Sequence, residues 1–158
     1  MKKLIKLFVI TTFIIYSYVI LHIVLLSRSH MFHTDAWVEI WTSGRLQYGV
    51  NLIPFKTISG YLNSIARGSI VQIAIRNLLG NLFLFLPLGI YLPLIWKKCR
   101  SLARTFFTSL CILVGIELVQ FITLLGSLDI DDLILNLLGV IIGYALWKWL
   151  KIVRYFNL

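Results

Sequence analysis

Polar side chains within the apolar stretches of this chain are the residues whose types and spacing could do chemistry. A charged group in hydrocarbon costs about 3 kcal/mol on insertion scales, so such residues face a bundle interior or a wet cavity. Glu117 and Asp132 are the candidate catalytic groups, because two carboxyl groups can share the roles of acid and base. The candidate ligand-binding residues are Asn51, Arg76, Asn77, Asn81, Glu117, Gln120, Asp129, Asp132 and Asn136.

Helical spacing places several of these residues on common faces. Asn77 and Asn81 are four residues apart and therefore share one side of a helix. Glu117 and Gln120 are three residues apart and also share a side. Within each pair, the two side chains are thus expected to point in the same direction.

A further polar stripe lies at the start of the last apolar segment. Asp129, Asp132 and Asn136 fall within roughly 60° of each other at 100° per residue. Gly139 and Gly143 continue this stripe, and their spacing is typical of close helix packing in membranes. The aspartates also suit a helix N-cap, since acids are stabilised at the positive end of a helix.

Four apolar segments must position these residues, and each approaches the roughly 20 residues that a bilayer requires. The apolar share of the chain is 59%, against roughly half in a soluble domain. We therefore predict an all-α, polytopic membrane helix bundle that forms one domain over residues 1–158. The predicted transmembrane helices cover about residues 4–26, 74–96, 102–125 and 130–150.

A long loop, residues 27–73, connects the first two segments on the predicted outer side. Its mildly amphipathic stretch, residues 58–73, predicts a helix that lies on the membrane surface or dips into it. His30, His33 and Asp35 occur in the loop without a helical pattern. We expect no metal site and no cofactor.

The polar residues are expected to meet at one depth. At 1.5 Å per residue, Asn81 and Glu117 each lie roughly 10 Å from the outer end of their segment, and Asn136 roughly 9 Å. Three helices thus place polar groups at one level of the outer leaflet. Arg76, near the outer interface, is the expected counter-ion of Glu117 or Asp132.

Basic residues give the chain a net charge of +9 and lie at the ends of the apolar segments. They cluster at the N-terminus, between the second and third segments, and near the C-terminus, which predicts a multi-pass plasma membrane protein with both termini in the cytoplasm. Trp96, Trp147 and Trp149 are expected to form an aromatic belt at the inner interface. The lipid bilayer is the expected partner. We expect no nucleic-acid partner, because the basic residues form no aromatic-interleaved patch.

A structural role for the same residues stays open. Glu117 could be a protonated acid that only bonds between helices, and Asn77, Asn81 and Asn136 could join helices in the same way. A homo-oligomer is also compatible with the sequence.

Four motifs follow one another between about residues 50 and 145 in an order that resembles the VanZ-like family of bacterial membrane proteins. They are Asn51-Leu52-Ile53-Pro54-Phe55; Asn77-Leu78-Leu79-Gly80-Asn81 with Phe85-Leu86-Pro87-Leu88-Gly89; Glu117-Leu118-Val119-Gln120-Phe121; and Asp129-Ile130-Asp131-Asp132 with Asn136, Gly139 and Gly143. Many relatives carry an arginine where this chain has Gly126. If that arginine serves chemistry, this chain either lacks it or uses Arg76 in its place.

The resemblance implies a function in the cell envelope and low-level resistance to glycopeptides of the teicoplanin type. The polar residues would then form an outer-leaflet pocket that binds a lipid-linked cell-wall precursor or a glycopeptide. Two alternatives remain. One is an intramembrane enzyme that acts on a lipid headgroup or cell-wall precursor, and the other is a small transporter subunit.

Overall fold

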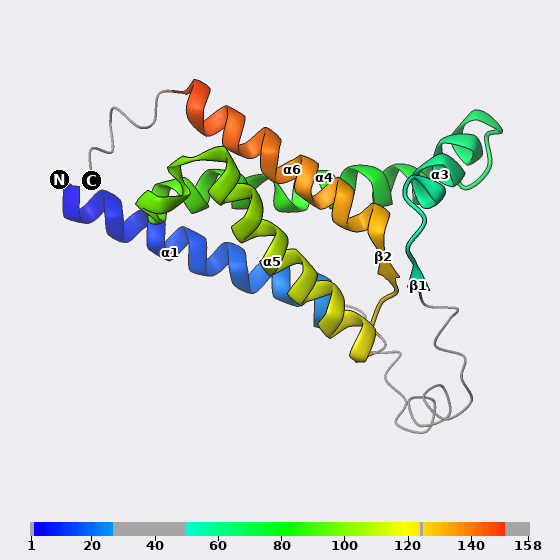
Figure 1. The fold of residues 1–158 in the computed structure, drawn as a ribbon, viewed down its shortest axis with the longest axis horizontal. Coiled ribbons are helices and arrows are strands. Elements are labelled where there is room, and N and C mark those ends of the chain that lie inside the picture. Colours follow the sequence, from blue (N-terminus) through cyan, green and yellow to red (C-terminus); the bar gives the residue numbers. More distant parts are fainter. Residues whose placement is uncertain (1, 27–49, 124, 151–158) are drawn as a thin grey trace.

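The computed structural model describes residues 2–26, 50–123 and 125–150 and is an all-α bundle (Figure 1). Its long helices are α1 (Lys2–Leu21), α4 (Val71–Ile95), α5 (Leu102–Ile122) and α6 (Ile130–Trp149). The short elements are the π-helical η1 (His22–Leu26), β1 (Val50–Asn51), α3 (Lys56–Ala66), the 3₁₀ turn η4 (Lys97–Arg100) and β2 (Leu128–Asp129). Within the described residues, four helices are long and apolar enough to cross a membrane. The predicted fold class is confirmed.

The two ends of the bundle differ in character. The start of α1, the turn η4 and the end of α6 lie at one end, which we call the basic end (Figure 1). Its described basic residues are Lys3, Lys6, Lys97, Lys98, Arg100, Arg104 and Lys148. The elements β1, β2 and α3 lie at the opposite end, which we call the strand end.

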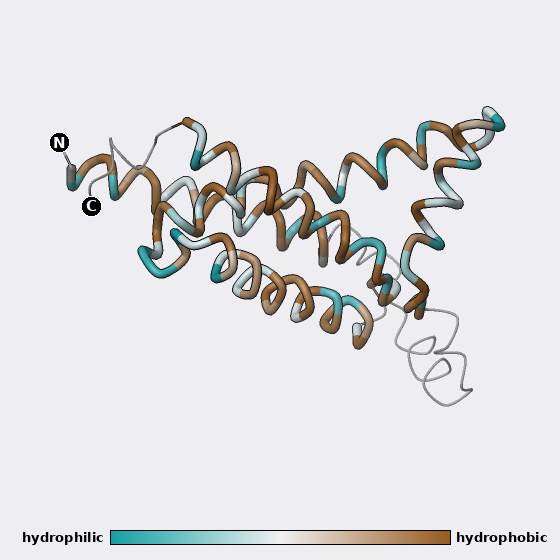
Figure 2. The backbone as a smooth tube through the Cα atoms, turned by 45° about the horizontal axis from the view of Figure 1, so that its top comes forward, coloured by the Kyte–Doolittle hydropathy of each residue, from teal (hydrophilic) through white to brown (hydrophobic). Residues whose placement is uncertain are grey.

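Apolar residues dominate the long helices, and hydrophilic residues gather in the turns (Figure 2). A small core of Phe85, Leu92, Leu113 and Val140 is buried between the helices. Large apolar side chains also point outward, and Phe8 is 69% exposed in the isolated chain. Lipid is the environment that removes such surface from water.

Glycines allow α4 and α6 to approach backbone to backbone. A Cβ atom on Gly139 would overlap the carbonyl oxygen of Leu82, and one on Gly143 would overlap that of Leu86. Gly89 is approached in the same way from α6. The expected packing role of the glycine pair is confirmed.

Several helix ends differ from the expected ones by a few residues. Helix α4 begins at Val71 rather than at about residue 74, and α5 ends at Ile122 rather than at about residue 125. The helix in the loop covers Lys56–Ala66 rather than residues 58–73, because the chain turns at Gly68, which has a φ of 68°. A left-handed residue of this kind ends a helix, and glycine adopts it without a steric cost.

The predicted aromatic belt is wrong for one of its three members. Trp96 and Trp149 are 53% and 77% exposed, as interfacial residues would be in the isolated chain. Trp147 is only 3% exposed, and its ring packs against Tyr144 with centroids 5.4 Å apart. It belongs to the protein interior because it lies on the inward face of α6.

Candidate functional site

A polar cavity of about 230 Å³ lies between η1, α4, α5 and α6, in the half of the bundle next to the strand end. Its polar lining residues are Arg76, Asn77, Asn81, Glu117, Gln120, Asp132 and Asn136. The structure therefore brings most of the sequence-predicted site residues together in one cavity. Asn51 and Asp129 do not line it.

A short hydrogen bond joins α4 to α6 at the cavity. The Nδ2 atom of Asn81 donates to Oδ1 of Asp132 at 2.5 Å. This bond lies beside the close glycine contacts, so the α4–α6 packing determines where both side chains sit.

Helix α5 contributes two buried polar side chains. Glu117 is 5% exposed and Gln120 is 8% exposed. Gln120 donates from Nε2 to the carbonyl oxygen of Val24 in η1 at 3.1 Å. A π-helical segment changes the regular backbone pairing, and such segments are frequent at functional sites. Gln120 thus fixes the end of the first helix against the cavity.

Two asparagines of the cavity lining differ in whether their side chains are already hydrogen-bonded within the protein. Asn77 donates from Nδ2 to the hydroxyl of Tyr61 at 2.6 Å, which ties α3 to α4. Asn136 is 5% exposed, and its Oδ1 atom has no hydrogen-bond partner among the described residues. A buried acceptor without a partner is costly. A donor placed in the cavity would satisfy it.

Arg76 lines the same cavity as Glu117 and Asp132. The lining therefore combines one cation with two carboxyl groups. The role of Arg76 as their counter-ion stays a prediction.

A second cluster at the strand end contains the remaining predicted residues. The strands β1 and β2 pair in parallel, with Asn51 beside Asp129. Asn51 donates from Nδ2 to Asp129 Oδ1 at 3.0 Å, and the Thr57 hydroxyl donates to Asp129 Oδ2 at 2.7 Å. Asp129 also caps α6 by accepting from the Asp131 amide at 2.9 Å. Its predicted N-cap role is confirmed.

The predicted stripe is wrong at its first member. Asp132 and Asn136 line the cavity, whereas Asp129 does not. Asp129 has φ −119° and ψ 119°, which is extended backbone before the helix starts. The 100° rotation per residue applies only inside a helix, so its side chain leaves the face that the other two share.

Asp131 is the residue that the sequence analysis did not select. It is fully buried, and its carboxylate accepts backbone N–H bonds from Phe55 at 2.5 Å, Thr57 at 2.7 Å and Ile58 at 3.1 Å. These amides form the N-terminus of α3, whose N-cap Phe55 supplies no side-chain acceptor. A helix start without Ser, Thr, Asp or Asn at its cap was the available signal that a distant acceptor is needed.

The aspartates of the fourth motif therefore have separate structural partners. Asp129 and Asp131 accept bonds from protein donors at the strand end, and Asp132 accepts from Asn81 in the cavity. Within the described residues, no group of three or more His, Cys, Asp or Glu side chains could hold a metal ion. His30, His33 and Asp35 lie outside the described residues.

Comparison with known proteins identifies the family. A profile of the VanZ/LLP1 family matches residues 13–151. Protein VanZ of Enterococcus faecium is 28% identical over 101 residues, which cover 64% of this chain and 53% of that protein. The chain thus spans about half the length of the curated relative that it matches. No solved structure gives a significant match. With four helices among its described residues that are long and apolar enough to cross a membrane, and a family match over most of its length, the chain is a membrane protein that belongs to the VanZ/LLP1 family.

Proposed function

We propose that this protein acts in the bacterial cell envelope and confers low-level resistance to teicoplanin-type glycopeptides by binding a ligand in its polar cavity. The observation that carries the proposal is the convergence of seven polar residues from α4, α5 and α6 on one cavity. Burying so many polar groups in a membrane bundle is costly unless they have partners. The similarity to Protein VanZ supports the assignment to the envelope.

The size of the cavity limits what it can hold. Its volume of about 230 Å³ is below the roughly 300–1,000 Å³ of sites for drug-sized ligands. An intact glycopeptide or a whole lipid-linked precursor would not fit. The cavity therefore suits one polar part of such a ligand, with the rest outside in lipid or at the membrane surface.

We further propose that the basic end faces the cytoplasm and that the polar cavity opens toward the outer leaflet. The basic residues of α1, η4 and α6 gather at one end, and Asp129, Asp131 and Asp132 lie toward the other. Reporter fusions should show this. A fluorescent protein fused to either terminus should fluoresce, and a periplasm-dependent phosphatase at the same positions should be inactive. The opposite pattern would reverse the orientation.

Resistance should depend on the cavity. In a Gram-positive host that lacks the gene, the wild type should raise tolerance to teicoplanin more than to vancomycin. Asn81→Ala, Glu117→Gln and Asp132→Asn should each reduce this gain. Loss of one hydrogen bond to a charged group costs about 1.5–3 kcal/mol, which weakens binding roughly 10- to 100-fold. Minimal inhibitory concentrations at matched membrane levels measure the effect.

Asn63→Ala is the matched control, because Asn63 is an exposed amide on α3 outside the cavity lining. It should keep the wild-type tolerance. If the cavity variants retain full resistance at wild-type protein levels, ligand binding in this cavity is not the mechanism. If the wild type itself changes no tolerance, the proposed resistance function is wrong.

The cavity also supports a second candidate function, an intramembrane enzyme acting on a lipid headgroup or cell-wall precursor. Glu117 and Asp132 line the same cavity, so an acid and a base could act on one bound group. An enzyme predicts that Glu117→Gln and Asp132→Asn abolish product formation while substrate still binds. A binding protein predicts graded losses of affinity and no product.

A further inference from the structure

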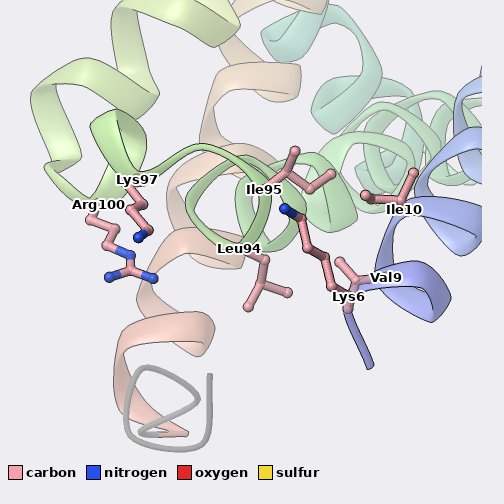
Figure 3. Close-up of a pocket in the computed structure, with 7 residues that line it drawn as sticks. All are labelled: Lys6, Val9, Ile10, Leu94, Ile95, Lys97 and Arg100. Carbon is pink, nitrogen blue, oxygen red and sulfur yellow. The ribbon is translucent and has the colours of Figure 1, made fainter. Parts of the chain in front are cut away.

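A second cavity, of about 160 Å³, lies at the basic end between α1, α4 and η4. Figure 3 shows Lys97 and Arg100 on one side and Lys6, from α1, across from them. We propose that this cavity binds the phosphate of an anionic phospholipid. The proposal is independent of the function assigned to the polar cavity.

The charges in this cavity point to an anionic ligand. Lys6, Lys97 and Arg100 contribute three cations to one lining, and no acidic side chain among the described residues lines it. Cations held around one small space repel each other unless an anion lies between them. The Nε atom of Arg100 is buried and has no hydrogen-bond partner among the described residues. A phosphate oxygen is an acceptor that would satisfy it, because a guanidinium matches phosphate geometry.

The rest of the lining points to a lipid rather than to free phosphate. Val9 and Ile10 come from α1, and Leu94 and Ile95 come from α4. Both helices are membrane-spanning in length and composition, so the cavity is next to the lipid phase. Apolar walls offer nothing to inorganic phosphate, whereas they can pack against glycerol and acyl carbons. Basic pockets between transmembrane helices are known to suit anionic headgroups.

The cavity at the basic end lies at the level expected for lipid headgroups. Lys97 and Arg100 belong to η4, the turn between α4 and α5, and Lys6 lies in the second turn of α1. Trp96, immediately before η4, is 53% exposed, and tryptophan prefers the level of the headgroups. A lipid phosphate would therefore reach the three cations without leaving its normal depth.

Lipid retention by the purified full-length chain tests the proposal. Native mass spectrometry from nanodiscs of equal phosphatidylglycerol and phosphatidylcholine should show phosphatidylglycerol retained by the wild type. A triple variant with Lys6→Gln, Lys97→Gln and Arg100→Gln should bind this lipid roughly 10- to 100-fold more weakly, given the electrostatic attraction of each basic residue. Added phosphatidylglycerol should also raise the melting temperature of the wild type and not that of the triple variant.

The control removes the same number of charges from the same basic end of the bundle. Lys3→Gln, Lys98→Gln and Arg104→Gln change basic residues that do not line this cavity. This control should retain phosphatidylglycerol like the wild type. An equal loss in the control would show a general surface attraction and overturn the proposal.

Two further experiments test whether the lipid occupies this cavity and whether the site prefers free phosphate. Leu94→Trp keeps every charge but fills the cavity, so it should lose selective retention even if the triple variant fails to fold. Retention that persists in Leu94→Trp would contradict a site in this cavity. Inorganic phosphate and glycerol 1-phosphate should not displace the lipid, and displacement by either at low millimolar concentration would show a free-phosphate site instead.

Discussion

Replacing Asp131 with alanine should detach α3 from the bundle and lower the free energy of unfolding by about 3–5 kcal/mol. The carboxylate accepts three backbone N–H bonds, from Phe55, Thr57 and Ile58. Each of these part-buried donors left without an acceptor costs about 1–2 kcal/mol, in the lower part of the range for buried donors, and the costs of neighbours do not add fully. Phe55 also has a φ of 66°, a conformation that a bulky residue adopts only when its surroundings enforce it.

Hydrogen exchange of the purified protein in detergent measures this effect at the amides themselves. In Asp131→Ala the amides of Phe55, Thr57 and Ile58 should lose protection, and unfolding in mixed micelles should occur at a lower denaturant fraction. Asp132→Asn is the matched control, since it removes an acidic group one residue further along and should leave these amides protected. Unchanged exchange in Asp131→Ala would mean that another group holds α3.

A methyl group at Gly143 should force α4 and α6 apart. Its Cβ would overlap the carbonyl oxygen of Leu86, which is backbone and cannot rotate away. Overpacking of this kind costs about 1–3 kcal/mol. The same separation would weaken the bond between Asn81 and Asp132, because both lie on the two helices that move. Gly143→Ala should therefore lower both the stability of the bundle and any activity of the polar cavity.

Gly115→Ala is the control for the general effect of replacing a helical glycine with alanine. Gly115 lies in the middle of α5, and a Cβ atom there would meet nothing within 4 Å. It should be neutral, or stabilising by up to about 1 kcal/mol because alanine favours the helix. Unfolding free energies in mixed micelles compare the two variants. Equal stability of both would contradict the close backbone contact between α4 and α6.

The four long helices could be predicted from the sequence because their apolar runs match the thickness of a bilayer. The helix ends could not be placed as well, since local turns decide them. Helix α4 starts as early as Val71 because the turn before it, with positive φ at Gly68 and Ile70, ends there. Trp147 could not be assigned to the interior either, because an aromatic residue near a helix end is equally compatible with a lipid interface.

The polar cavity was largely predictable for a simple reason. Asn81, Glu117 and Asn136 lie inside helices of known rise and rotation, so their depth and face follow from counting residues. Asp129 lies in extended backbone before α6, where that counting fails. The cavity at the basic end was also not foreseen, because the sequence shows Lys6 and Arg100 only as charges that flank apolar segments and not that both line one cavity.

By itself, the sequence determined the class of the protein, its four spanning helices and the polar residues that share a level, because each depends on local composition and helical geometry. Only the tertiary structure decided the long-range partners of the aspartates. Asp131 and the amides of residues 55–58 are more than 70 positions apart, and nothing local in either segment identifies the other. Long-range pairing of this kind depends on how β1 and α3 fold back onto the start of α6, where one buried carboxylate supplies the acceptors that the helix α3 lacks.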